Sequence, residues 1–373
     1  MSQAKNLQKI NFFAYFFTKK HIGGRKMSVT SELFGKLADG TEISKYWIQN
    51  CNGMKVGIIN YGAIITNLIV PTKNGDKDIV LGYDTIEPYT VNDCFFGAVV
   101  GPNANRICKG AYSIDGVSYQ IEINDGENNC HSHKTLGYHK VVWSVETGSN
   151  FVILSITDTD GNLGFPGNRK LSVTYTLTDD NELKLHYQGI SDKNTVLNPT
   201  NHTYFNLLGH ASGNIMTHKM QILASNYTPV VPGAIPTGEI ATVKGTPLDL
   251  TTAKVVGEDI DAPFEQLELT SGYDHNWVID NADGSLRKCA VVTEDTAGIT
   301  MNVYTTLPGV QFYAGNFVSE QTGKDGATYG RRQGLCLETQ YFPDAINNPS
   351  FPSPVFGPDR KYATTTVYEF KMN

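Results

Sequence analysis

Residues 171–187 carry the clearest secondary-structure pattern in the chain. They read Leu171-Ser172-Val173-Thr174-Tyr175-Thr176-Leu177, then Thr178-Asp179-Asp180-Asn181, then Glu182-Leu183-Lys184-Leu185-His186-Tyr187. Apolar and polar residues alternate with a period of two in both outer segments, as they do in a strand that buries one face. The four residues between these segments are turn formers. The stretch therefore predicts a β-hairpin whose antiparallel strands are residues 171–177 and 182–187.

The rest of the chain shows the same kind of pattern. From about Ser28 onward, short alternating runs are bounded by Gly, Asn, Asp and Pro, and helical periodicity is scarce. Further strands are predicted at residues 151–156, 291–293 and 299–304, and 36 glycines supply turns at close spacing. Because many strands with few helices must bury their apolar faces against one another, we expect an all-β protein, a large antiparallel β-sandwich.

The length leaves the number of domains open. At 373 residues the chain could hold two average domains, but no clear repeat or low-complexity linker divides it. We therefore expect a single β-sandwich domain over residues 28–373, preceded by a disordered N-terminal extension over residues 1–27. The apolar run at residues 12–17 is too short for a signal peptide and lacks a small-residue cleavage site.

Composition and charge exclude several classes of partner. Lys and Arg total 30 against 37 Asp and Glu, a formal net charge of -7, and no basic stripe is present. A nucleic-acid partner is therefore not expected. No segment approaches the roughly 18 apolar residues of a membrane span, so we expect no membrane partner. The six cysteines lack Cys-x-x-Cys spacing, which favours reduced, buried thiols and a cytoplasmic protein.

Two separated segments carry the candidate chemistry. Asn198-Pro199-Thr200-Asn201-His202-Thr203-Tyr204-Phe205-Asn206-Leu207 surrounds one histidine with the hydroxyl, amide and aromatic groups that bind sugars. Far downstream, Glu338 is the single charge in a strand-like run, where desolvation would raise its pKa toward that of a useful base. A histidine acid and a glutamate base suit reversible proton transfer on a sugar. The structural alternatives are a core histidine and an exposed strand charge.

Six motifs in order resemble those of the aldose 1-epimerase (galactose mutarotase) family, over nearly everything after Met27. They are Gly97 to Ile107, Asn201 to Leu207, Pro236-Thr237-Gly238 with Gly245-Thr246-Pro247-Leu248-Asp249, Gly272-Tyr273-Asp274-His275, Pro308-Gly309-Val310-Gln311-Phe312-Tyr313, and Glu338-Thr339-Gln340 through Pro343-Asp344-Ala345. The resemblance implies the supersandwich fold of that family. It also implies an isomerase that interconverts the α and β anomers of free hexoses, such as galactose and glucose, without a metal or organic cofactor.

The resemblance assigns a role to each matched residue. It makes His202 the general acid, which protonates the ring oxygen, and Glu338 the general base, which takes the proton of the anomeric hydroxyl. It implies sugar contacts for five further residues, Asn105, Arg106, His131, Asp274 and Gln311. A structural salt bridge, an Asx turn and an edge-strand position are the alternatives for Arg106, Asp274 and Gln311.

The chain departs from the family pattern at two places. Pro102 follows Gly101, where the family commonly has an arginine. The family's second histidine is normally followed by two glycines, whereas this chain reads His131-Ser132-His133-Lys134, so that His133 is an alternative to His131.

Other functions stay open on the sequence. Cys130, His131, His133 and His139 could hold zinc, although no second closely spaced ligand pair completes the set. A hexose-6-phosphate epimerase or a non-catalytic sugar-binding protein would share the fold. A glycosidase would need two carboxylates about 5 to 9.5 Å apart, such as Asp274 and Glu338. Because the site motifs supply one arginine and a phosphate usually needs several cations, we favour a free hexose over a sugar phosphate as the substrate. We expect the protein to be a monomer or a weak dimer.

Overall fold

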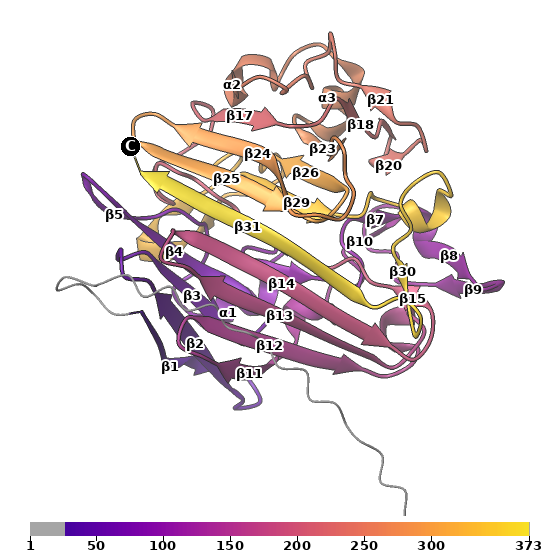
Figure 1. Ribbon diagram of the computed structural model, residues 1–373, viewed down its shortest axis with the longest axis horizontal. Helices are drawn as coiled ribbons and strands as arrows, with labels where there is room; N and C mark the ends of the chain where they lie inside the picture. The colour runs from indigo at the N-terminus through magenta and orange to yellow at the C-terminus, as the bar shows by residue number, and fades with distance from the viewer. Residues whose placement is uncertain (1–26, 373) are drawn as a thin grey trace, which may run out of the picture.

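The computed structural model describes residues 27–372, so the expected extension over residues 1–27 lies, except for Met27, outside the described residues. The described chain consists mainly of antiparallel strands with a few short helices, which confirms the all-β prediction. Its strands form two layers: a nine-stranded sheet lies on one side, and two five-stranded sheets lie on the other (Figure 1).

The nine-stranded sheet contains the predicted hairpin. In spatial order its strands are β11 (Ser144–Thr147), β12 (Phe151–Asp158), β13 (Arg169–Leu177), β14 (Glu182–Ser191), β31 (Tyr362–Met372), β25 (Ile299–Thr305), β24 (Arg287–Glu294), β17 (Lys219–Ile222) and β22 (Lys254–Val255). β13 and β14 pair with Leu177 opposite Leu183, which confirms the hairpin and its turn. The strands predicted at residues 151–156, 291–293 and 299–304 lie within β12, β24 and β25.

The second layer contains both five-stranded sheets. One runs in the order β1 (Ser28–Lys36), β2 (Glu42–Gln49), β3 (Lys55–Ile59), β4 (Ile64–Thr72) and β5 (Gly75–Asp78). The other runs in the order β21 (Ala241–Thr242), β18 (Asn226–Tyr227), β23 (Asp274–Val278), β26 (Gly309–Tyr313) and β29 (Cys336–Gln340).

A short strand pair connects these two sheets. β6 (Ala98–Val100) and β16 (Thr200–His202) pair with each other. Before β6, the carbonyl of Gly97 accepts a hydrogen bond from the backbone of Ile65 in β4, and after β16 the backbones of Phe205 and Leu335 bond to each other beside β29. The end of β16 is thereby held next to β29.

The remaining strands and α-helices are short and lie between the long strands in the sequence. They are α1 (Ile86–Val91), β7 (Arg106–Ile107), β8 (Ala111–Ile114), β9 (Val117–Gln120), β10 (Asn129–Cys130), β15 (Thr195–Val196), β19 (Val230–Val231), β20 (Ile235–Pro236), α2 (Val256–Asp259), α3 (Glu265–Thr270), β27 (Gln321–Thr322), β28 (Thr328–Tyr329) and β30 (Val355–Phe356). Within residues 27–372, every helix is too short or too polar to cross a membrane.

The core lies between the two layers and decides which face of β29 is available for chemistry. Tyr368 of β31 packs on Phe205 with ring centroids 5.0 Å apart, and its hydroxyl donates to the carbonyl of Leu337 at 3.2 Å. Leu337 belongs to this core. Because side chains alternate along a strand, Cys336 and Glu338 project from the opposite face of β29, away from the nine-stranded sheet.

The cysteines differ in burial. Cys289 and Cys336 are buried, whereas the other four are only partly buried. The expectation of buried thiols is therefore wrong for those four, because they lie in turns and short connecting segments outside the long strands, where Cys94 and Cys130 line a pocket.

Candidate active site

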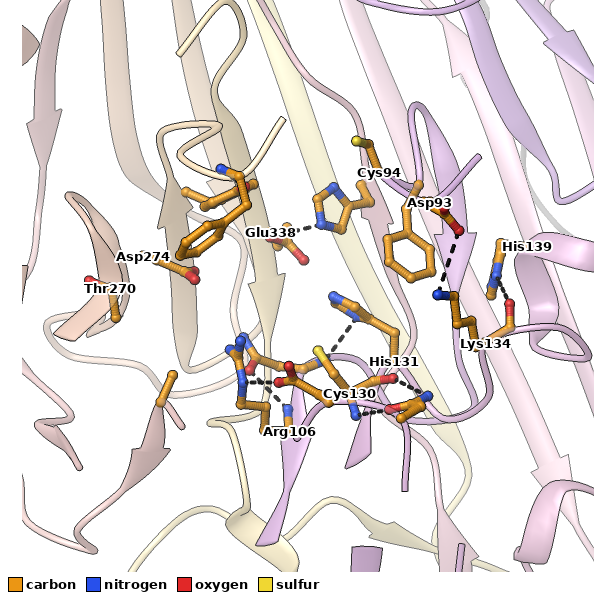
Figure 2. A pocket seen from close by; sticks show the side chains of 18 of the residues that line it. Asp93, Cys94, Arg106, Cys130, His131, Lys134, His139, Thr270, Asp274 and Glu338 are labelled. Atoms are coloured by element: carbon orange, nitrogen blue, oxygen red, sulfur yellow. Dashed lines mark hydrogen bonds and ion pairs between the residues drawn. The ribbon is translucent and has the colours of Figure 1, made fainter. Parts of the chain in front are cut away.

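A pocket of about 490 Å³ opens on the face of the second layer that points away from the core. This volume is within the range of small-molecule sites. Six of the seven predicted site residues line it: Asn105, Arg106, His131, His202, Asp274 and Glu338. Figure 2 shows the side chains of four of them, Arg106, His131, Asp274 and Glu338, converging from strands and loops that are distant in the sequence.

Three neighbouring strands position the acidic wall of the pocket. Glu338 of β29 is opposite Gln311 of β26, and Gln311 is opposite Asn276 of β23. Asp274 precedes Asn276 by two residues and therefore projects from the same face of β23. Gln311 is buried, and its Nε2 donates to Oδ1 of Asp274 at 2.8 Å. Gln311 thus orients Asp274 and is not among the residues that line the pocket.

His202 and Glu338 face each other inside the pocket. Nε2 of His202 lies 3.7 Å from Oε1 of Glu338, and their side chains are only 5% and 3% exposed. Oε2 of Glu338 has no hydrogen-bond partner within residues 27–372. The separation of the pair is longer than a hydrogen bond. Both groups therefore keep polar atoms available for a ligand.

Neighbouring groups fix the orientation of the His202 imidazole. The rings of Phe95 and Tyr204 stack on it, with centroid distances of 5.7 and 5.1 Å and interplanar angles of 28° and 23°. Sγ of Cys336 lies 3.4 Å from Nδ1. With Nδ1 next to the sulfur, Nε2 is the nitrogen directed at Glu338.

Burial shifts the pKa of each member of this pair in the direction that favours the uncharged form of the group. Desolvation lowers the pKa of His202 to about 4, because the imidazolium loses its hydration. Desolvation also raises the pKa of Glu338 well above its usual 4.5, with a further increase from Asp274 and an opposing effect of Arg106. Neutral imidazole with carboxylic acid holds the same single proton as imidazolium with carboxylate.

Arg106 forms one wall of the pocket. Its Nε donates to Oδ2 of Asp125 at 2.8 Å, so the salt bridge considered in the sequence analysis is present. Burial opposes the guanidinium charge, but Cys130, Asp274 and Asp125 outweigh it and raise the pKa of Arg106. Its two Nη groups make no hydrogen bond within residues 27–372. They can therefore donate to a ligand while Nε holds the side chain in place.

His131 lines the pocket, whereas His133 does not. Nδ1 of His131 accepts a hydrogen bond from the backbone N–H of Asn105 at 3.2 Å, so the neutral ring carries its proton on Nε2. Desolvation, together with His202 and Arg106, keeps the pKa of His131 well below its usual range. His133 instead lies with Nδ1 3.3 Å from Oε2 of Glu122. His131 is the histidine that can donate to a ligand oxygen.

The four residues considered for zinc do not converge. His133 is next to Glu122, and Nε2 of His139 lies 3.1 Å from the carbonyl of Lys134. Across residues 27–372, the ligand atoms of one other set, His131, His202 and Glu338, lie within 4.8 Å of one another. A metal on Nε2 of His131 would require the other tautomer and would break the bond to Asn105. This donor set suits a hydroxyl ligand better than a metal ion.

The site also contains residues that the sequence analysis did not predict. Phe95 lines the pocket in the left-handed backbone region with φ 59°, a costly conformation for an aromatic residue. Asp125 holds Arg106, and Cys336 contacts His202. No local signal identifies them, because Phe95 precedes Phe96 and resembles core, and the other two contacts depend on tertiary structure.

Known proteins resemble this chain in sequence and in structure. A family model described as aldose 1-epimerase matches residues 44–369. The chain is 41% identical over 350 residues to galactose mutarotase of Homo sapiens, covering 92% of this chain and 99% of that protein. It is 34% identical over 336 residues to aldose 1-epimerase of Escherichia coli, covering 89% and 96%. The crystal structure of galactose 1-epimerase from Lactobacillus acidophilus superposes with a TM-score of 0.80 at 26% identity, covering 93% and 99%. The resemblance inferred from the six motifs is confirmed.

Proposed function

Because this chain belongs to the aldose 1-epimerase family, we propose that His202 and Glu338 transfer protons to and from the hexose whose anomers it interconverts. The protein is an isomerase, and its substrates are free hexoses such as galactose and glucose. One observation carries the assignment of roles: His202 and Glu338 lie 3.7 Å apart, both buried, in a pocket lined by groups that bind hydroxyls.

Ring opening uses the imidazolium and carboxylate forms of the pair. Nε2 of His202 gives its proton to the ring oxygen, and Glu338 takes the proton of the anomeric hydroxyl. The bond between the anomeric carbon and the ring oxygen breaks, and the anomeric carbon becomes a carbonyl. One proton has moved from His202 to Glu338 by way of the sugar, so neither atoms nor charge are left unbalanced.

Ring closure uses the same pair in exchanged roles. Rotation about the bond between the first two carbons presents the other face of the carbonyl to the hydroxyl oxygen of the open chain. His202 then takes the proton of that hydroxyl, and Glu338 returns its proton to the carbonyl oxygen. Burial favours the neutral imidazole and the carboxylic acid, which are the forms that accompany the open-chain sugar. This arrangement of the single proton is the one that ring opening leaves and from which ring closure starts.

The other site residues hold the sugar so that its ring oxygen and anomeric hydroxyl lie next to His202 and Glu338. The Nη groups of Arg106 and Nε2 of His131 donate to sugar oxygens, and the carboxylate of Asp274 accepts from sugar hydroxyls. Asn105 supports the site from the backbone, because its N–H holds Nδ1 of His131. Gln311 acts through its bond to Asp274.

The charge of the pocket supports a free hexose over a hexose 6-phosphate. Arg106 is paired with Asp125, and Nζ of Lys134 lies 3.9 Å from Oδ1 of Asp93. Asp274 and Glu338 add further acidic groups to the lining. A phosphate dianion would meet these acids without an unmatched cation to bind it. A neutral sugar meets no such repulsion.

Three further proposals rest on the sequence. Residues 28–373 form one domain, as the lack of a clear linker suggests. The protein acts in the cytoplasm, a proposal supported by the scattered spacing of its six cysteines. It acts as a monomer or weak dimer.

The proposed pair should give a bell-shaped dependence of kcat/KM on pH. Activity needs the state with one shared proton. Below a pH near the lowered His202 pKa of about 4, the pair gains a second proton and Glu338 can no longer act as a base. Above the raised pKa of Glu338, the pair loses its last proton and His202 has none to give. The check is polarimetry across pH with the uncatalysed rate subtracted at each pH. A rate independent of pH across this range would contradict the shared-proton mechanism.

A further inference from the structure

One contact of His202 has no part in the mechanism described above. Sγ of Cys336 lies 3.4 Å from Nδ1 of His202, and both residues are buried. Cys336 comes from the same face of β29 as Glu338, two residues away, so one strand supplies both the base and this thiol. Within residues 27–372, Cys336 is the side-chain hydrogen-bond partner of Nδ1, and the backbone of His202 itself also forms a hydrogen bond with the ring.

The reversible reaction requires one particular tautomer of neutral His202. During ring opening Nε2 loses its proton to the sugar, and during closure the same atom must accept one. The proton that remains on the neutral ring must therefore be on Nδ1. With the opposite tautomer, Nε2 would have no lone pair for closure, and proton loss from it would create an imidazolate. A buried N–H needs an acceptor, because leaving it unpaired is costly.

We propose that Cys336 is a positioning residue whose Sγ accepts the Nδ1–H of His202 and so keeps the Nε2 lone pair directed at the sugar. The proposal rests on the proposed function, because it concerns the tautomer that the acid and base steps need. A thiol sulfur is a weak acceptor. The rings of Phe95 and Tyr204 compensate by fixing the imidazole plane, so that Nδ1 remains next to the sulfur.

The tautomer can be measured directly in the unmodified protein. In protein labelled with 15N-histidine, the chemical shifts of the two ring nitrogens distinguish a protonated from an unprotonated atom, and the His202→Asn variant assigns the signals. We expect Nδ1 to carry the proton and Nε2 to be unprotonated at neutral pH. A neutral ring with the proton on Nε2 would overturn the proposal, whatever the activity.

Variants of Cys336 test the consequence for catalysis. Cys336→Ala removes the side-chain acceptor and should lower kcat by about twofold and at most about tenfold, the upper figure being the value of one ordinary hydrogen bond, with KM within about twofold of wild type. Cys336→Ser keeps an acceptor and should retain more of kcat than Cys336→Ala. Cys289→Ala is the matched control, because Cys289 is equally buried but lies in β24 of the nine-stranded sheet, whereas Cys336 lies in β29 next to His202. It should leave kcat unchanged.

Other outcomes would contradict the proposal. Equal losses in the serine and alanine variants, or an equal loss in Cys289→Ala, would reduce Cys336 to a packing role. If Cys336→Ala fails to fold, the activity of Cys336→Ser and the 15N spectrum of the wild-type protein still test the role of Cys336. Failure of the proposed function is separate from these results, since it would show as a wild-type protein that does not accelerate anomer exchange.

Discussion

Replacing Glu338 with glutamine should lower kcat by about two to four orders of magnitude, the usual contribution of a positioned base, while KM changes little. The amide has nearly the shape of the carboxylate but cannot accept the proton of the anomeric hydroxyl. The measurement is the initial rate of anomer exchange for the purified variant, followed by polarimetry on freshly dissolved α-galactose.

Two controls make this result specific. Glu146→Gln applies the same change on an exposed position of β11 outside the pocket, and it should behave like the wild type. Folding should not suffer in Glu338→Gln. Because the pKa of Glu338 is raised in the folded state, the folded protein binds this proton more tightly than the unfolded chain does, and it loses stability as the pH rises from the ordinary pKa of 4.5 toward the raised one. The neutral amide removes that cost. If Glu338→Gln turned over nearly as fast as the wild type, Glu338 would not be the general base.

Replacing His202 with asparagine should cause a loss of kcat of similar size, about two to four orders of magnitude. The amide can donate a hydrogen bond, but it cannot give a proton to the ring oxygen and take it back. The same polarimetric assay measures this variant. His186→Asn is the matched control, because His186 lies in β14 and contacts Thr365 instead of the pocket. Its rate should be unchanged.

The double variant shows whether His202 and Glu338 act together. If the two residues act as one unit, removing both should cost little more than removing either alone. A loss equal to the product of the two single losses would indicate independent roles. A His202→Asn protein with nearly full turnover would show that another group supplies the acid.

The local parts of the fold were predictable from the sequence, whereas the long-range pairings were not. Alternation and turn residues identified the hairpin of β13 and β14, because both depend on neighbouring residues. The pairing of β14 with β31, from the far end of the chain, has no local signal. Alternation shows which side chains of a strand are buried but not which strand lies next to it.

For the site, the sequence identified the two proton-transferring residues but not the contacts that position their neighbours. Motifs identified His202 and Glu338, and the structure brings them together although 136 positions separate them in the chain. The position of Gln311 behind Asp274 could not be predicted, because it depends on the register between β23 and β26. The choice of His131 over His133 depends on the local backbone, in which His131 adopts φ 54° and bonds to Asn105. Sequence patterns do not encode such geometry reliably.

Polarimetry can show whether His202 and Glu338 exchange protons with a free hexose. Freshly dissolved α-galactose is followed to equilibrium in buffer alone, with the wild-type protein and with Glu338→Gln, and galactose 6-phosphate is followed in parallel. We predict that the wild-type protein accelerates equilibration of the free sugar well beyond the buffer rate and acts far less on the phosphate, and that the variant stays near the buffer rate. A wild-type protein that leaves the rate for galactose at the buffer value would contradict the account.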